Sequence, residues 1–312
     1  MEMKLQGGKL KMINKKTKKN IKKILELIIS IIVAIILLIY GKENKSQVSQ
    51  VQENENGIKT IVIGTGDATS ENNLHVYYID VGQADSILIK NKDESALIDA
   101  GNNEDGKNVV EFIKSKGITK LNYVIGTHPH EDHIGGLDDV INNIEIDKIY
   151  LPNVQTTTKT YEDVLTAIKN KNKTISSFSK GDKFNIGNAK AEVMTDSIIN
   201  ENNLNLSSNI IRMQYENTSF LFTGDAEKEN ENMRSNWPQT DILKVGHHGS
   251  STSTSQKFLN QIKPNYAIIS VGKNNDYGHP NATILKRLNN IGAKVFRTDE
   301  SGTIEIIVTE NL

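Results

Sequence analysis

Residues 127–133 place four side chains that bind metal ions in one short turn. The run reads Thr-His-Pro-His-Glu-Asp-His, and its candidate ligands are His128, His130, Asp132 and His133. Zinc and manganese accept imidazole nitrogen and carboxylate oxygen, and a tight loop can divide such ligands between two ions. A chance surface cluster is the alternative, but four candidate ligands in seven residues are rare. The spacing therefore predicts a two-metal site for hydrolysis.

The elements around this turn must position the ligands. A β-rich run at 122–126 predicts a strand that leads into the turn, and a helix is expected at about 134–142. We expect further strands at 74–81, 86–90, 95–100, 148–151, 191–194, 210–215, 220–222, 242–245, 266–271, 294–297 and 303–308. We expect further helices near 109–116, 161–170, 226–235, 255–262 and 281–290. So many strands favour two sheets packed face to face, with helices outside, over a doubly wound α/β fold.

The N-terminal region has the pattern of a membrane anchor. Residues 24–40 are mostly apolar and Glu26 is their only charged residue, whereas nine lysines and one glutamate occupy residues 1–23. This predicts one transmembrane helix at 24–40, with a basic cytoplasmic tail at 1–23 and everything later outside the cell membrane. A cleaved signal peptide, which would make the protein secreted, is the alternative. Polar residues 41–73 are expected to form a linker and 74–312 the working domain.

Composition excludes some chemistry and limits the choice of partners. The chain has no cysteine, which rules out disulfides, a cysteine nucleophile and a diacylated lipoprotein. The net charge is −1, and the basic tail leaves the rest at about −9. An acidic body lacks the broad basic surface expected of strong DNA binding. A local basic patch is the alternative, and its candidates are Lys244, Lys273, Lys286 and Arg287.

The motifs resemble those of the metallo-β-lactamase superfamily from about residue 74 to the C-terminus. The H-x-H-x-D-H spacing, Asp99, Asp225 and the His247-His248 pair occur in that family's order. Within the superfamily, the runs at 78–86, 246–250 and 277–280 resemble the hydrolase domain of ComEC-type DNA-uptake proteins. The resemblance implies an α/β fold, an αββα four-layer sandwich, preceded here by the transmembrane helix.

The resemblance also implies a set of ligands for two divalent ions, zinc or manganese. His128 and His130 would hold the first ion, Asp132 and His133 the second, and Asp225 would bridge them. The second ion also takes one residue of the pair His247 and His248. We expect His248, because adjacent residues at a strand end point opposite ways. His247 would then face the cleft or the core.

The chain departs from many superfamily members in one ligand. No histidine lies between His133 and Asp225, where a third ligand for the first ion is common. The run at 205–209 stands there instead and resembles the Asn-x-x-Ser run of the ComEC type. The first site is therefore expected to be more open, completed by water, a substrate oxygen or His279. Ser207, Ser208 and Asn209 are candidates for substrate binding, with polar residues at a strand start as the equal alternative.

Three aspartates and two histidines complete the expected site. Asp85 is a candidate for substrate binding in a glycine-containing turn, and a plain β-turn is the alternative. Asp99 is expected to accept the second N–H of a ligand histidine. Asp132, His247 and His279 are the catalytic candidates. His279 would protonate the leaving group or contact phosphate, and the alternative is a loop histidine that caps the helix beginning near 281.

The resemblance implies a phosphodiester substrate hydrolysed by metal-activated water, so a phosphodiesterase or nuclease is expected. The substrate would be single-stranded DNA or a wall polymer such as teichoic acid. A phosphorylcholine esterase and, less favoured, a β-lactamase are alternatives. A different class is a catalytically idle surface module that binds DNA or wall polymer. A membrane channel is an expected partner, because in ComEC proteins the hydrolase domain accompanies a multi-span channel region.

Overall fold

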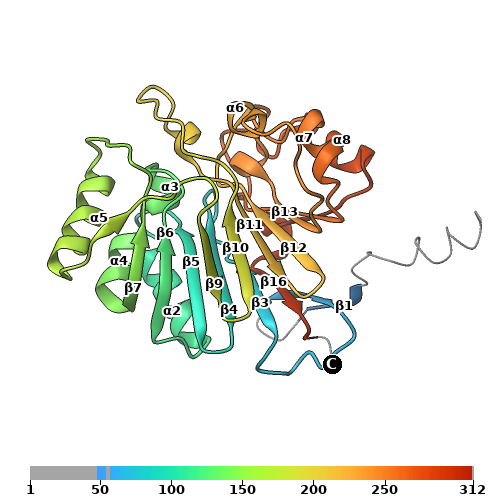
Figure 1. Cartoon of the computed structure of the whole chain (residues 1–312), viewed down its shortest axis with the longest axis horizontal. Helices are drawn as coiled ribbons and strands as arrows, with labels where there is room; N and C mark the ends of the chain where they lie inside the picture. The colour runs from blue at the N-terminus through green and yellow to red at the C-terminus, as the bar shows by residue number, and fades with distance from the viewer. Residues whose placement is uncertain (1–47, 54–56, 311–312) are drawn as a thin grey trace, which may run out of the picture. The chain divides into compact units, whose positions relative to one another are not determined.

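Two mixed β-sheets pack face to face, and helices cover their outer surfaces (Figure 1). The computed structural model describes residues 48–53, by their backbone alone, and residues 57–310. The central core contains apolar side chains from both sheets, among them Ile98 and Ile306 from the first and Met213 and Phe220 from the second. These layers form the α/β, αββα sandwich that the motifs predict.

The first sheet has nine strands in the order β1-β2-β16-β3-β4-β5-β6-β7-β8. Its strands are β1 (Val48–Glu53), β2 (Lys59–Ile63), β3 (Leu74–Tyr78), β4 (Ser86–Asn91), β5 (Glu94–Ala100), β6 (Lys120–Ile125), β7 (Glu145–Tyr150), β8 (Ile175–Ser176) and β16 (Ile304–Val308). β3, β4 and β5 are antiparallel neighbours, whereas β5 to β8 run parallel.

The second sheet has seven strands in the order β15-β14-β13-β12-β11-β10-β9. Its strands are β9 (Lys183–Ile186), β10 (Ala189–Val193), β11 (Ile211–Tyr215), β12 (Thr218–Phe222), β13 (Ile242–Lys244), β14 (Tyr266–Ile269) and β15 (Lys294–Arg297). β9 to β12 are antiparallel and β12 to β15 are parallel. Each sheet therefore has a parallel part whose strand ends can meet at one edge.

The helices cover the two sheets separately. They are α2 (Gly106–Ser115), α3 (Glu131–Ile134), α4 (Leu137–Asn143), α5 (Lys159–Asn170), α6 (Lys228–Asn232), α7 (Gln256–Ile262), α8 (Ala282–Asn290) and α9 (Thr298–Ser301), with 3₁₀ turns η1 (Leu204–Ser207) and η2 (Gly246–Gly249). α2, α4 and α5 share a core with the first sheet, and α7 and α8 share one with the second.

Successive side chains of the central strands point alternately into two different cores, which explains why these strands are apolar at nearly every position. In β4, Ile87 and Ile89 enter the core between the sheets, whereas Leu88 enters the core beneath the helices. In β5, Ile98 faces the first of these cores and Leu97 the second. Because successive side chains point to opposite faces and both faces are covered, every position favours an apolar residue.

The expected linker at 41–73 is wrong for part of its length. β1 and β2 lie within it, and β2 pairs in parallel with β16 and antiparallel with β1. Ile61 and Ile63 are buried in the core between the sheets. The short apolar run at 61–63 therefore supplies a sheet strand, because its pairing partner comes from the far end of the chain.

Two other expectations differ in detail. The helix expected at 134–142 is divided into α3 and α4 at Gly135 and Gly136, and the short strands β8 and β9 are additional. The segment at 24–40, expected to cross the membrane, lies outside the described residues. Among residues 48–53 and 57–310, no helix has the length and apolar character needed to cross a membrane.

Candidate metal centre

The turn at 127–133 is fixed by Asp99 from the neighbouring strand. β5 and β6 run parallel, so Asp99 in β5 lies beside the turn that follows β6. Thr127 donates its backbone N–H and its hydroxyl to the two oxygens of Asp99, each at 2.8 Å. Asp99 has a φ of 58°, an unfavourable backbone for a non-glycine residue that is typical of functional sites. The aspartate therefore turns its carboxylate toward the histidines.

Two glycines allow the helical part of the turn to approach β5 closely. A Cβ atom on Gly135 would lie 2.3 Å from the Asn103 nitrogen, and one on Gly136 would lie 2.4 Å from the Ala100 oxygen. Both contacts are with backbone, which cannot swing aside as a side chain can. The absence of side chains here lets α3 present Asp132 and His133 next to Asp99.

The second half of the chain supplies its residues from another pair of parallel strands. Asp225 follows β12, and His247 and His248 lie in η2 just after β13. Both histidines have a φ of 51°, so they occupy a left-handed turn and not the strand end that the sequence predicts. His247 donates its backbone N–H to the Gly224 oxygen at 3.1 Å, which joins η2 to the Asp225 loop.

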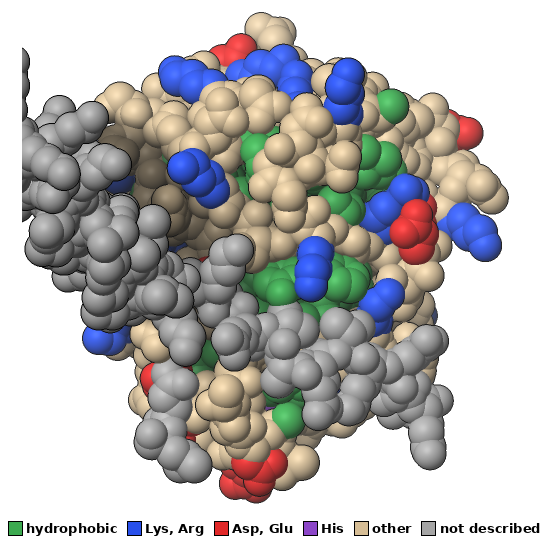
Figure 2. Space-filling view, turned by 90° about the vertical axis from the view of Figure 1, so that its right-hand side faces the viewer, with side chains coloured by type: hydrophobic (Ala, Val, Ile, Leu, Met, Phe, Trp, Pro, Cys, Tyr) green, Lys and Arg blue, Asp and Glu red, His purple; other side chains and the backbone are tan. Residues whose placement is uncertain are grey.

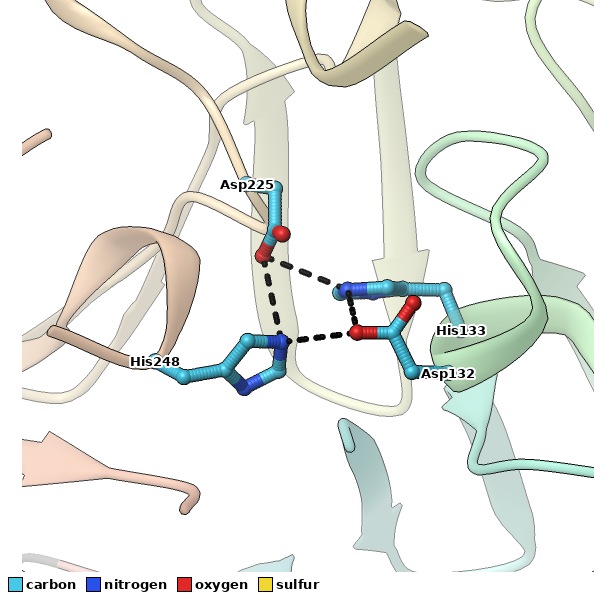
Figure 3. A group of neighbouring side chains, drawn as sticks. All are labelled: Asp132, His133, Asp225 and His248. Carbon is cyan, nitrogen blue, oxygen red and sulfur yellow. Dashed lines mark hydrogen bonds and ion pairs between the residues drawn. The ribbon is translucent and has the colours of Figure 1, made fainter. Parts of the chain in front are cut away.

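Asp132, His133, Asp225 and His248 converge on one point (Figure 3), and a ligand atom of each lies within 4.8 Å of the others. His248 Nε2 is 3.2 Å from Asp132 Oδ2 and 3.7 Å from Asp225 Oδ1. His133 Nε2 is 3.2 Å from Asp225 Oδ1 and 3.8 Å from Asp132 Oδ2. This cluster brings together the four residues expected around the second ion.

His133 and His248 each make a hydrogen bond through Nδ1, so in both rings Nε2 faces the cluster. His133 Nδ1 lies 2.7 Å from Asp99 Oδ2, and His248 Nδ1 lies 3.0 Å from the Ser270 carbonyl oxygen. An acceptor at Nδ1 fixes the proton there and leaves the Nε2 lone pair free. His133 Nε2 and Asp225 Oδ1 are buried without a hydrogen bond. A divalent cation fits this set of inward-facing nitrogen and oxygen atoms.

The charges of the cluster support the same conclusion. Burial raises the pKa of Asp225, but the neighbouring His133 and His248 outweigh it, and the pKa lies well below its usual range. Burial lowers the pKa of His133, yet the carboxylates of Asp225, Asp99 and Asp132 hold it well above the ordinary value. In the absence of an ion, a proton on His133 thus supplies the positive charge that these carboxylates require.

His128, expected to hold the first ion together with His130, lies on the side of the other carboxylate oxygen of Asp225. His128 Nε2 is 2.9 Å from His130 Nδ1 and 3.9 Å from Asp225 Oδ2. Asp225 Oδ1 faces the four-residue cluster and its Oδ2 faces His128, so this carboxylate lies between the two positions. His247 Nε2 is 3.5 Å from the same Oδ2. His247 therefore lies near the same carboxylate oxygen of Asp225 as His128 does.

The family model described as the metallo-beta-lactamase superfamily matches residues 79–273, a stretch that contains the four-residue cluster. The chain belongs to the metallo-β-lactamase superfamily. Among solved structures, the metallo-beta-lactamase fold protein YhfI from Bacillus subtilis is similar, with a TM-score of 0.50 and 13% identity over 75% of this chain and 99% of that one. That likeness supports the αββα assignment.

Curated relatives of this superfamily member are ComEC-type competence proteins. ComE operon protein 3 of Bacillus subtilis (strain 168) is 33% identical over 248 residues, which cover 73% of this chain and 32% of the relative. Recombination protein 2 of Haemophilus influenzae is 30% identical over 234 residues, covering 73% and 28% respectively. The chain thus spans about a third of the length of the relatives it matches.

A pocket of about 360 Å³ includes three residues of the four-residue cluster, Asp132, Asp225 and His248, in its lining. It is lined by Gln83, His130, Glu131, Asp132, Asp225, His247, His248, Tyr277 and His279. All three catalytic candidates, Asp132, His247 and His279, face this pocket. Gln83 and Glu131 were not singled out from the sequence, although both lie inside the motifs that carry the resemblance.

Three substrate-binding candidates do not reach the pocket. Ser207 donates its hydroxyl to the Leu204 oxygen at 2.7 Å, and Asn209 donates its amide to the Thr195 oxygen at 2.8 Å. Asp85 is 1% exposed and forms an ion pair with the buried Lys244. Their polar atoms are buried and bind within the protein, so the structure does not place these three side chains in the pocket, and their role in substrate binding stays a prediction.

Ser208 is also buried, but it contacts the metal centre from behind. Its hydroxyl lies 3.3 Å from His128 Nδ1 and accepts the Asp225 backbone N–H at 3.3 Å. Since His128 Nδ1 faces Ser208, Nε2 is directed toward Asp225. Ser208 thus contacts a histidine expected to be a ligand, and its own role in substrate binding stays a prediction.

The expected basic patch does not form as a unit. Lys244 is completely buried, and Arg287 donates to the backbone oxygens of Ser253 and Thr254. Figure 2, viewed from the side where α7 and α8 lie in Figure 1, shows lysine and arginine side chains spread among neutral ones. Lys244 and Arg287 are therefore not part of a joint basic surface.

Proposed function

We propose that this chain is a phosphodiesterase that holds two divalent ions, zinc or manganese, and cleaves a nucleic acid strand. The observation that carries the proposal is the position of Asp225 between two sets of ligands at the base of an open pocket. Two ions about 3.5–4 Å apart are typical of phosphodiester cleavage. When bound, such a pair supplies hydroxide near neutral pH and stabilises negative charge on phosphate oxygens.

The chain's own residues prepare this chemistry in three ways. Asp99 and the Ser270 carbonyl hold the protons of His133 and His248 at Nδ1. Asp225 and Asp132 provide the negative charge that offsets the cost of concentrating cations in a buried site. His279 lines the pocket beside the cluster, where the leaving part of the substrate would lie.

His279 is the group proposed to act on the leaving oxygen. Its backbone is held by Asn275, which accepts the His279 N–H at 3.0 Å and donates to the His279 carbonyl at 2.7 Å. The imidazole lines the pocket but is absent from the four-residue cluster. It is therefore positioned to contact phosphate or to move a proton without serving as an essential ligand.

The cellular setting is a further part of the proposal. The apolar segment at 24–40 and the lysines before it support a single anchor with the hydrolase domain outside the membrane. The alternative is secretion after cleavage of that segment. The similarity to competence proteins supports single-stranded DNA as substrate and a membrane channel as partner. Fractionation tests the setting, since protein found only in the medium would contradict the anchor.

The experiment uses the purified full-length chain with Mn²⁺ or Zn²⁺ and compares four substrates. These are single-stranded DNA, bis-nitrophenyl phosphate, a phosphorylcholine ester and a β-lactam. We expect metal-dependent hydrolysis of DNA and of the small phosphodiester, and none by Asp225→Ala. Binding of DNA without hydrolysis under either metal would indicate the idle surface module instead. Hydrolysis of only the choline ester or only the lactam would reassign the enzyme.

A further inference from the structure

Tyr277 is an exposed aromatic side chain at the rim of the metal pocket. Among the described side chains, the exposed large hydrophobic ones are Ile175, Ile199 and Tyr277, with Tyr277 the most exposed at 73%. Only Tyr277 is aromatic, and only Tyr277 lines the pocket over the metal positions. A single exposed apolar residue is ordinary on a protein surface, but its location beside reacting groups is not.

The ring of Tyr277 is supported on one face. It stacks on the His279 imidazole with 5.7 Å between centroids and 24° between planes. Asn275 donates its amide to the Gly272 oxygen at 3.0 Å and to the His279 oxygen at 2.7 Å, which closes the loop that carries both rings. Gly272 in turn donates its N–H to Gln83, another pocket residue. The loop thus holds the ring in place with its other face toward solvent.

A fixed aromatic face beside a phosphodiester site has a direct chemical use. Every nucleobase has a flat π-face, and proteins that bind single strands stack successive bases on aromatic side chains. We propose that Tyr277 is the stacking platform for the nucleobase next to the scissile phosphate. The inference rests on the proposed function and narrows it, because it selects a nucleic acid over a wall polymer as the substrate.

The pocket lining argues against a choline group as the occupant. Quaternary ammonium groups are recognised by cages of several aromatic faces. Tyr277 is the one tyrosine, tryptophan or phenylalanine among the pocket residues 83, 130–132, 225, 247–248, 277 and 279. A single face stacked on an imidazole suits a planar ring better than a spherical cation.

The test compares intact oligonucleotides with strands that lack one base. The full-length chain, loaded with Mn²⁺, is given a labelled oligothymidylate or the same strand with one abasic tetrahydrofuran residue moved along it. We expect Tyr277→Ala to lower kcat/KM on the intact strand roughly 5- to 150-fold, the range for loss of one base stack. At the bond next to the missing base, wild type and Tyr277→Ala should be equal.

Control variants separate stacking from folding and from phosphate contact. Tyr277→Phe and Tyr277→Trp keep a flat ring and should retain activity on the intact strand. Ile175→Ala removes a different exposed apolar side chain, on β8, and should leave kcat/KM unchanged on both the intact and the abasic strand. Equal losses for Tyr277→Ala on intact and abasic strands would overturn the platform, as would a loss confined to a choline phosphodiester.

A binding measurement distinguishes this inference from the proposed function. Anisotropy of the labelled strands is recorded with Ca²⁺, in wild type and Tyr277→Ala. If no phosphodiester is hydrolysed but wild type still prefers the intact strand and Tyr277→Ala does not, the platform stands and the phosphodiesterase assignment fails. If hydrolysis occurs without any dependence on base or on Tyr277, the assignment stands and the platform fails.

Discussion

Lys244 and Asp85 form an ion pair in the interior, with 2.7 Å between Nζ and Oδ2 and side chains that are 0% and 1% exposed. Asp85 Oδ1 is also 3.5 Å from His248 Nδ1, and the Asp85 backbone N–H donates to the Asp132 oxygen at 3.0 Å. The pair therefore lies directly behind two residues of the metal cluster. It joins the loop before β4 to strand β13.

Replacing Lys244 should be strongly destabilising. Lys244→Met keeps much of the volume but leaves the Asp85 carboxylate buried without a counter-charge. Loss of one partner of a buried pair costs about 3–5 kcal/mol, and urea unfolding of the metal-free protein measures it. The double variant Asp85→Asn/Lys244→Met removes both charges and should lose much less than the sum of the two single variants. Strict additivity would show that the two charges do not interact.

Asp225→Ala should remove both metal binding and hydrolysis. The substitution deletes the carboxylate between the two ligand sets, and each set loses an oxygen. Elemental analysis after dialysis measures bound metal, and hydrolysis of bis-nitrophenyl phosphate measures activity. Asp147→Ala serves as the matched control, because Asp147 is a partly exposed aspartate paired with Lys120. Normal activity in Asp225→Ala would rule out a two-metal mechanism.

Metal affinity should fall as the pH is lowered. Burial lowers the pKa of His133, but its three carboxylate neighbours raise it well above the ordinary value, so the metal-free protein holds a proton there. A metal ion binds the neutral ring and must displace that proton, which costs about tenfold in apparent affinity per pH unit. Titration calorimetry in buffers of different ionisation enthalpy counts the released protons. Metal binding without proton release would contradict the prediction.

The stability of the metal-free protein should change with pH in the opposite direction. A group whose folded pKa is raised contributes stability that is complete below its unfolded pKa, about 6.5 for histidine, and is lost as the pH rises through the folded value. His133 is then neutral and no longer offsets the negative charges of Asp225, Asp99 and Asp132. Thermal unfolding should therefore shift downward above neutral pH without metal. Zinc or manganese should suppress this shift.

His279→Ala should slow turnover and leave metal content nearly unchanged, because His279 lines the pocket outside the four-residue cluster. General acid catalysis is typically worth about 100-fold or more, and a loss of that size is expected in kcat. His279→Asn keeps a hydrogen-bond donor but cannot exchange a proton near neutral pH. If kcat recovers in His279→Asn, the role of His279 is phosphate contact. If kcat does not recover, its role is proton transfer. Loss of metal in either variant would make His279 a ligand.

Ile61→Ala tests whether the segment before residue 74 belongs to the fold. Ile61 is 0% exposed in the core between the sheets, so truncation should cost about 2–5 kcal/mol of unfolding free energy. Ile175→Ala, at a side chain 41% exposed, should change it by less than about 0.5 kcal/mol. Equal stability of the two variants would contradict a structural role for β2.

The sequence predicts best what depends on local spacing. His128 to His133 lie in one turn, so a metal-binding turn could be inferred from their spacing, and the number of strands favoured a layered fold. The roles of Asp99 and Asp225 came from the resemblance to the superfamily. The burial of Lys244 could not be inferred, since a lysine is expected at the surface unless Asp85 is known to lie against it. β2 was missed for a similar reason, because its five residues become a strand only through pairing with β16.

Ser207 and Asn209 show another limit of sequence reasoning. Both side chains lie in the 205–209 run, which was expected to contact substrate. Their hydrogen bonds instead go to the backbone oxygens of Leu204 and Thr195. Residue type cannot distinguish a polar atom directed into a pocket from one that satisfies a buried carbonyl. His248 was chosen over His247 with a strand argument, although the structure uses a left-handed turn.

The four residues of the cluster come from two distant parts of the chain. Asp132 and His133 follow the first sheet's parallel strands, whereas Asp225 and His248 follow those of the second. No ion can be held by all four until the ribosome has released residue 248 and both sheets have docked. An ion held by all four residues would therefore bind only after both halves of the domain have come together, and a product that ends before η2 would lack the cluster.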